Sequence, residues 1–141
     1  MNDTAAIAED ARLLLDELDR DLPGAAHLSA ECRPALDIME TTEATEVVVD
    51  VPGVGAGSLR VAIRANTVMI VGAKLVPAAP ANARFHLAER TYGRFARAVR
   101  IAGAFDANRA TAILENGLLH IVLPRIEDRR GRLVRVAVDV A

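Results

Sequence analysis

The stretch R-A-T-A-I-L-E-N-G-L-L-H-I-V-L-P, residues 109–124, consists of two strand-like runs on either side of Asn116-Gly117. Asn-Gly supplies the positive φ angles of a type I′ turn, whose twist matches that of paired antiparallel strands. A two-residue loop would give one wholly apolar face, with Leu114 opposite Leu119, Ala112 opposite Ile121 and Ala110 opposite Leu123. A three-residue loop with a glycine bulge would shift the register by one residue and regroup the faces. The sequence therefore predicts a hairpin with one core face, favours the first pairing and leaves the second open.

The composition predicts one domain with a modest core. The chain has 141 residues, 52% of them apolar but only 3% aromatic, so aliphatic side chains and alanine must fill the interior. A formal net charge of −2 gives no reason to expect nucleic acid or an anionic membrane as a partner. No apolar stretch reaches the roughly 18 residues that span a bilayer, and the N-terminus lacks a signal-peptide pattern. We therefore expect a cytoplasmic protein without integral membrane contact.

The middle of the chain has the two-residue period of strands. Alternating or continuous apolar runs, separated by turn residues, occupy residues 35–40, 45–51, 59–64, 67–71, 85–90 and 95–101. Short strands recurring about every 10 residues are typical of an all-β sandwich. Residues 74–83, with two prolines among alanines, interrupt this rhythm as a long loop, and a loop of that length usually has a use.

The two ends of the chain have different patterns. Residues 5–22 predict an amphipathic helix whose apolar stripe either lies on the sheet or meets another copy of the chain. Residues 127–132 form a charged tether, followed by a valine at every second position from Val134 to Val140. Such a strand would either add to the sheet edge of another chain or be the last strand of its own domain. The residues alone leave both choices open.

No pattern for catalysis, metal binding or cofactor binding emerges. The histidines, His27, His86 and His120, lie in separate segments without metal-ligand spacing, and Cys32 is the only cysteine. Ser29 and Ser58 occur in no nucleophile motif. The glycines of residues 53–57 lead into a strand rather than into a helix that binds phosphate. We therefore expect a protein that is not an enzyme, without catalytic residues, cofactor or metal.

Several blocks of sequence, in order, resemble the alpha-crystallin domain of small heat-shock proteins. The hairpin carries Ala112-x-x-x-Asn116-Gly117-Leu118-Leu119 followed by Ile121-x-Leu123-Pro124, which is similar to the family signature. The other blocks are Pro34-x-x-Asp37-Ile38-x-Glu40, Val51-Pro52-Gly53-Val54, Leu59-x-Val61, Val68-x-Ile70-x-Gly72 and Glu89-Arg90-x-Tyr92-Gly93-x-Phe95-x-Arg97. The resemblance covers residues 34–124.

This resemblance implies an immunoglobulin-like antiparallel β-sandwich and an ATP-independent holdase that binds partly unfolded proteins and prevents their aggregation. It divides the chain into an N-terminal arm with the amphipathic helix (residues 1–33), the alpha-crystallin domain (34–124) and a C-terminal extension (125–141). The expected partners are the chain itself, as a dimer and a higher homo-oligomer, and unfolding client proteins. The alternative is a non-enzymatic adaptor or scaffold with one dedicated partner, because no aromatic residue precedes Phe85 and family arms are often rich in phenylalanine.

The resemblance also implies two assembly sites. In bacterial and plant members the loop strand, here residues 85–88, pairs with the first strand of the partner, here residues 35–40. The implied dimer interface comprises Asp37, Ile38, Phe85, Leu87, Glu89, Tyr92 and Arg97. Val134 and Val136 match the C-terminal anchor, which would dock in a neighbour's groove formed by Leu59, Val61, Ile63, Ile113 and Leu114. The resemblance thus favours a tail that pairs with another chain.

Overall fold

The computed structural model describes residues 3–24, 32–126 and 133–141. Within these ranges one α-helix, nine strands and two 3-10 turns are present. They are α1 (Asp3–Asp21), β1 (Leu36–Glu40), β2 (Ala44–Asp50), η2 (Ala56–Ser58), β3 (Leu59–Arg64), β4 (Thr67–Lys74), β5 (Gly93–Arg100), η3 (Ala107–Arg109), β6 (Thr111–Glu115), β7 (Leu118–Pro124), β8 (Leu133–Val136) and β9 (Val138–Val140). The predicted tether at 127–132, His27 and Ser29 lie outside the described residues.

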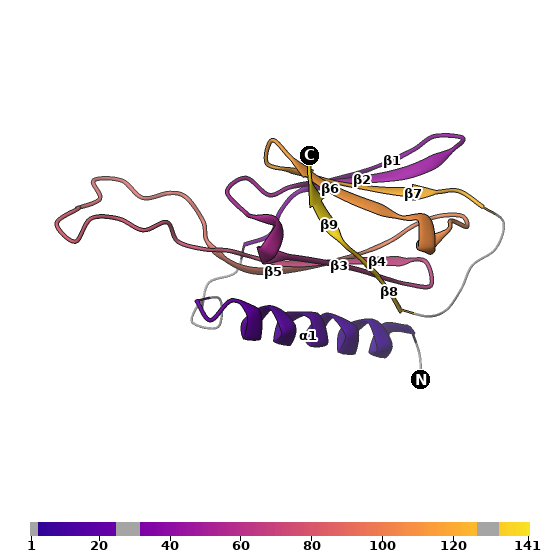
Figure 1. Ribbon diagram of the computed structural model, residues 1–141, viewed down its shortest axis with the longest axis horizontal. Coiled ribbons are helices and arrows are strands. Elements are labelled where there is room, and N and C mark those ends of the chain that lie inside the picture. The colour runs from indigo at the N-terminus through magenta and orange to yellow at the C-terminus, as the bar shows by residue number, and fades with distance from the viewer. Residues whose placement is uncertain (1–2, 25–31, 127–132) are drawn as a thin grey trace.

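The strands form two stacked sheets (Figure 1). The five-stranded sheet has the order β1-β2-β7-β6-β9, and the four-stranded sheet has the order β5-β4-β3-β8. Neighbouring strands are antiparallel except β6 and β9, which run parallel. The predicted antiparallel sandwich is confirmed, with one parallel pair added by the end of the tail.

The hairpin of β6 and β7 takes the first of the two predicted registers. Leu114 lies opposite Leu119 across a two-residue loop. The φ angles of Asn116 and Gly117 are 54° and 76°, both positive as a type I′ turn requires. The glycine-bulge alternative is therefore wrong, and the apolar face of the hairpin is the core face.

The core lies between the two sheets and is mainly aliphatic. Buried and less buried residues alternate along β2 and β7, as expected for strands with one face turned inward. Phe95 and Phe105 are its aromatic members. The core also contains Val47, Val49, Leu59, Val61, Ile63, Val68, Ile70, Leu119, Ile121 and Leu123.

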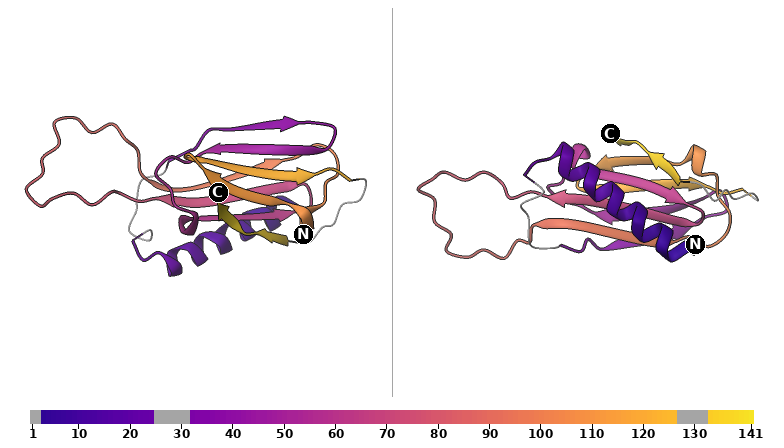
Figure 2. Two further views of the ribbon diagram at one scale, coloured as in Figure 1. Left: turned by 45° about the horizontal axis from the view of Figure 1, so that its top comes forward. Right: turned by 90° about the horizontal axis from the view of Figure 1, so that it is seen from below.

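Helix α1 lies across the outer face of the four-stranded sheet, against β3 and β4 (Figure 2). Leu14 and Leu18, one helical turn apart, are 1% and 0% exposed. Strand β4 is buried along nearly its whole length because alternate residues face the core and the helix. Met69 and Val71 are on the helix side. The apolar stripe of the helix therefore lies on the sheet of its own chain.

The chain between β4 and β5 forms a long loop that projects from the sandwich (Figure 1). The strand predicted at residues 85–90 is wrong for the single chain, in which these residues belong to no helix or strand. A strand requires a neighbour to pair with, and within the described residues none pairs with this stretch. The alternating pattern of residues 85–90 suits a β-strand, but in the single chain this stretch pairs with no other described strand.

We predict that Gly72→Ala destabilises the sandwich by about 1–3 kcal/mol. A Cβ atom at Gly72 would lie 2.4 Å from Cζ of Phe95 and 2.9 Å from the carbonyl oxygen of Ser58. Urea unfolding followed by circular dichroism at one protein concentration measures the effect. Gly57→Ala is the matched control because nothing lies within 4 Å of its Cβ position. Equal unfolding midpoints for the two variants would contradict this packing.

Candidate assembly surfaces

Strand β8 of the C-terminal tail lies beside β3 at the edge of the four-stranded sheet. Val136 is paired with Val61, and Val134 is paired with Ile63. Val136 is 8% exposed, and Val134 packs against the core. The two predicted anchor valines thus meet two of the predicted groove residues. Leu59, a third groove residue, lines the cavity beside Val136.

The tail then crosses to the other sheet and continues as β9 beside β6 (Figure 1). In this parallel register Val140 lies opposite Leu114, and Asp139 lies opposite Ile113. Leu114 is 9% exposed on the core face, whereas Ile113 is 39% exposed. The hairpin register therefore places Leu114 in the core beside the tail and leaves Ile113 outside.

The tail occupies the groove of its own chain in this structure. The same strand in a neighbour's groove would make the same pairs, so the intermolecular anchor remains a prediction. The contact extends beyond the two valines of the motif, because Val138 also packs against the core. The alternating valines of the tail therefore pair with strands of both sheets.

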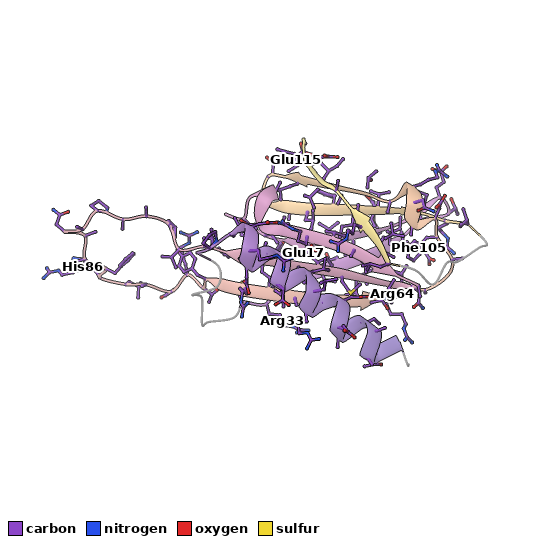
Figure 3. The ribbon with its side chains drawn as sticks, turned by 60° about the horizontal axis from the view of Figure 1, so that its bottom comes forward. Glu17, Arg33, Arg64, His86, Phe105 and Glu115 are labelled. Atoms are coloured by element: carbon purple, nitrogen blue, oxygen red, sulfur yellow. The ribbon has the colours of Figure 1, made fainter. Side chains whose placement is uncertain are left out.

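Arg135, the residue between the two anchor valines, is paired with Glu17 of α1, which Figure 3 labels on the helix. Nη2 of Arg135 lies 2.7 Å from Oε1 of Glu17, and Nη1 donates to Oε2 at 2.8 Å. The hydrogen bond from Arg135 holds the pKa of Glu17 below its usual value. This bidentate ion pair connects the N-terminal helix to the C-terminal strand.

We predict that Arg135→Gln raises the pKa of Glu17 back toward that of a free glutamate, because the side-chain hydrogen bond from Arg135 is the main cause of the lowered pKa. The lowered pKa in the folded chain means that the pair stabilises it fully above the pKa of a free glutamate. That stabilisation is lost as the pH falls through the lowered pKa, so wild type and variant should converge in stability in acid. Titration of the Glu17 carboxyl carbon by NMR measures the pKa. Arg12→Gln, which removes the ion-pair partner of Glu9, is the control and should leave the pKa of Glu17 as it is in the wild type.

Three further ion pairs between α1 and the sheet were missed by the sequence analysis. Their partners are Asp10 with Arg64, Asp19 with Arg94, and Asp21 with Arg60. Figure 3 labels Arg64 beside the helix. A signal was present, since Asp10 precedes Leu14 by four residues and therefore shares its face of the helix. The sequence could not identify the arginines because they lie far away in the chain.

The predicted dimer residues on β1 and in the loop are exposed. Strand β1 has β2 on one side and no strand of the described chain on the other. Ile38 on β1 is 46% exposed, and Phe85 and Leu87 in the loop are 76% and 75% exposed. Figure 3 shows His86, between these two loop residues, far from the sandwich. The single chain leaves Phe85 and Leu87 largely uncovered and Ile38 about half uncovered.

The remaining predicted dimer residues lie near the base of the loop or on the strands. Asp37 is exposed on β1, and Glu89 is exposed in the loop without an ion-pair partner among the described residues. The ring of Tyr92 lies beside Lys74, whose Nζ is 5.8 Å from the ring centroid. Arg97 on β5 donates a hydrogen bond of 2.6 Å to the carbonyl oxygen of Pro34 within the same chain. An intermolecular ion pair of Glu89 or Arg97 therefore stays a prediction.

Over residues 3–24, 32–126 and 133–141, no group of three or more histidine, cysteine, aspartate or glutamate side chains is placed to hold a metal ion. No helix in these ranges is long and apolar enough to cross a membrane.

The sandwich and most of the tail match a known family. Residues 37–138 match the model of the Hsp20/alpha crystallin family. This chain belongs to that family. Small heat-shock proteins are non-enzymatic chaperones, so membership leads us to expect a chaperone role for this small heat-shock protein.

Relatives and solved structures agree with this membership. The 21.9 kDa heat shock protein of Oryza sativa subsp. japonica is 37% identical over 138 residues, covering 86% of this chain and 67% of the relative. Small heat shock protein C2 of Rickettsia felis is 30% identical over 103 residues, covering 73% of this chain and 67% of the relative. Heat shock protein 16.0 of Schizosaccharomyces pombe has a TM-score of 0.66 at 28% identity, covering 72% of this chain and 94% of that one. A small heat-shock protein of Xylella fastidiosa, described as having a distinct high order structure, has a TM-score of 0.63 at 26% identity, covering 76% and 98%.

Proposed function

We propose that this small heat-shock protein is an ATP-independent holdase, which binds partly unfolded proteins and keeps them from aggregating. The observation that carries the proposal is the family match across residues 37–138. The apolar groove beside β3, which Val134 and Val136 of the tail cover, supports it. Unfolding proteins expose apolar surface, and contact between two such surfaces is favourable without nucleotide.

In the proposed dimer, residues 85–88 of one chain pair with β1 of the other. The open edge of β1 presents unpaired N–H and C=O groups, which an added strand would satisfy. The same pairing would cover Ile38, Phe85 and Leu87, which are exposed in the single chain. The long projecting loop supports this proposal because it gives the segment reach.

The tail is the second proposed contact between chains. Val134 and Val136 would occupy the groove beside β3 of a neighbour in the register that they take in their own chain. Exchange of an identical element between copies keeps every contact and has a low energetic cost. A groove covered reversibly by a tail would protect an apolar edge until a client requires it.

Thermal aggregation of an unrelated heat-labile enzyme tests the holdase proposal. With the chain at about an equal molar amount and no nucleotide, light scattering should stay near the baseline, and adding ATP should change nothing. An equal mass of an inert globular protein is the control. If scattering at several-fold molar excess of the chain equals that of the enzyme alone, the proposal is wrong.

A dedicated adaptor or scaffold is the second candidate function. It is favoured by the position of α1, which lies on the sheet of its own chain instead of extending as an arm. The stretch before Phe85 also contains no aromatic residue. A pull-down that returns one specific partner, from a chain that fails to protect unrelated enzymes, would establish this alternative.

A further inference from the structure

The outer face of the four-stranded sheet is an apolar strip bordered by arginines. Ala62 and Ala73 lie in this strip, and both are buried beneath α1 together with Met69 and Val71. The bordering side chains are Arg60 and Arg64 on β3, Arg94 on β5 and Arg135 on β8. The sheet register brings them to one face: Arg94 lies opposite Ala73, and Arg135 lies opposite Ala62.

Helix α1 complements this face in both shape and charge. Leu14 and Leu18 fill the apolar strip. Each of the four arginines is paired with an acidic side chain of the helix: Arg64 with Asp10, Arg135 with Glu17, Arg94 with Asp19 at 2.9 Å, and Arg60 with Asp21 at 2.6 Å. The face therefore recognises a helix with leucines four residues apart and carboxylates along both sides.

The contact is of a kind that can open. The alanines of the strip make it shallow; Leu14 and Leu18 are the buried helix residues on it, and Ile7, Leu15 and Leu22 pack beside them partly exposed. Arg135 and Arg94 have side chains that are 51% and 37% exposed, and ion pairs this exposed contribute little to stability, whereas Asp10 in the pair with Arg64 is only 10% exposed. A helix attached to the same chain nevertheless competes well, because its effective concentration at the face is high.

We propose that this arginine-bordered face binds acidic amphipathic helices of unfolding proteins, and that α1 is its built-in competitor. The inference rests on the proposed holdase function and names one class of client segment. Charge complementarity selects the occupant, since a basic helix would bring like charges against the arginines. The face also differs in kind from the β1 edge and the tail groove, which suit extended strands.

The test uses the full chain with α1 undocked by Leu14→Asp and Leu18→Asp, which place two charges in the apolar strip. The probe is a fluorescent peptide that copies residues 4–22. Anisotropy should show the undocked variant binding this peptide about ten-fold more tightly than the wild type does. Binding should also weaken in high salt.

A second peptide keeps the leucines but has amides in place of Asp10, Glu17, Asp19 and Asp21. It should bind the undocked variant about ten-fold more weakly than the acidic peptide. Equal binding of the two peptides, or no binding of either to a variant whose strand content is intact by circular dichroism, would overturn the inference. If the first variant fails to fold, Asp10→Asn with Asp19→Asn loosens α1 without adding a charge to the strip.

The aggregation assay separates this inference from the proposed function. Failure of the wild type to protect an unfolding enzyme would refute the holdase, whereas peptide binding is judged independently of it. If the holdase function and the helix-binding inference are both correct, the undocked variant should protect an acidic helical client better than the wild type does. The acidic peptide should then remove this additional protection. A gain that the peptide leaves untouched would overturn the inference.

Discussion

Replacing both Phe85 and Leu87 by aspartate should dissociate the proposed dimer. The two side chains are 76% and 75% exposed in the single chain, so the substitutions should leave the sandwich itself intact. In the dimer they would lie against β1 of the partner, where an unpaired buried charge costs roughly 3–5 kcal/mol. The dissociation constant should therefore rise more than about a hundredfold. Size-exclusion chromatography with light scattering measures the resulting loss of mass.

Val76→Asp is the matched control for this pair of substitutions. Val76 lies in the same loop, is 61% exposed and falls outside the predicted interface. The added charge should leave the mass unchanged, which separates a loss of contact from a general effect of charge on the loop. If the Phe85 and Leu87 variant kept the mass of the wild type, the proposed dimer contact would be wrong.

Replacing Val134 and Val136 together by aspartate should release the tail and reduce the size of the assembly. Val136 is 8% exposed against the core, so a carboxylate there would be buried without a partner. Loss of β8 would uncover the edge of β3, and the backbone amides of β3 should exchange with deuterium at least about ten-fold faster. Binding of a dye to apolar surface should rise as well.

Val140→Asp is the control for the tail. It places one carboxylate on the same segment, at a side chain that is 71% exposed and should tolerate it. Unchanged mass and unchanged exchange of β3 in the Val134 and Val136 variant would show that the tail does not hold the groove. Faster deuterium exchange of the β3 amides without a change in the mass of the assembly would show that the tail docks only within its own chain.

The parts of the fold that depend on local chemistry were predictable from the sequence. The register of the β6–β7 hairpin follows from Asn116-Gly117, because positive φ angles at both positions select one turn type. Strand β3 follows from strict alternation, and its predicted bounds agree with Leu59–Arg64. The two anchor valines lie beside Val61 and Ile63 of their own chain, and their predicted docking in a neighbour's groove stays a prediction.

The sequence did not show which segments would lie beside one another in the fold. The alternation at residues 85–90 is a true strand pattern, but a strand exists only where another lies beside it. The leucines of α1 predicted an apolar face without saying what covers it. The parallel pairing of β9 with β6 depends on the tail crossing between the sheets, which no short-range pattern encodes.

The native mass of the unmodified chain tests the proposed assembly most directly. The central claim is that the apolar side chains of β1 and the loop are covered by a second chain. At micromolar concentration, light scattering after size-exclusion chromatography should give at least twice the 15.0 kDa of one chain. A mass of 15.0 kDa that persists as the concentration is raised would contradict the claim.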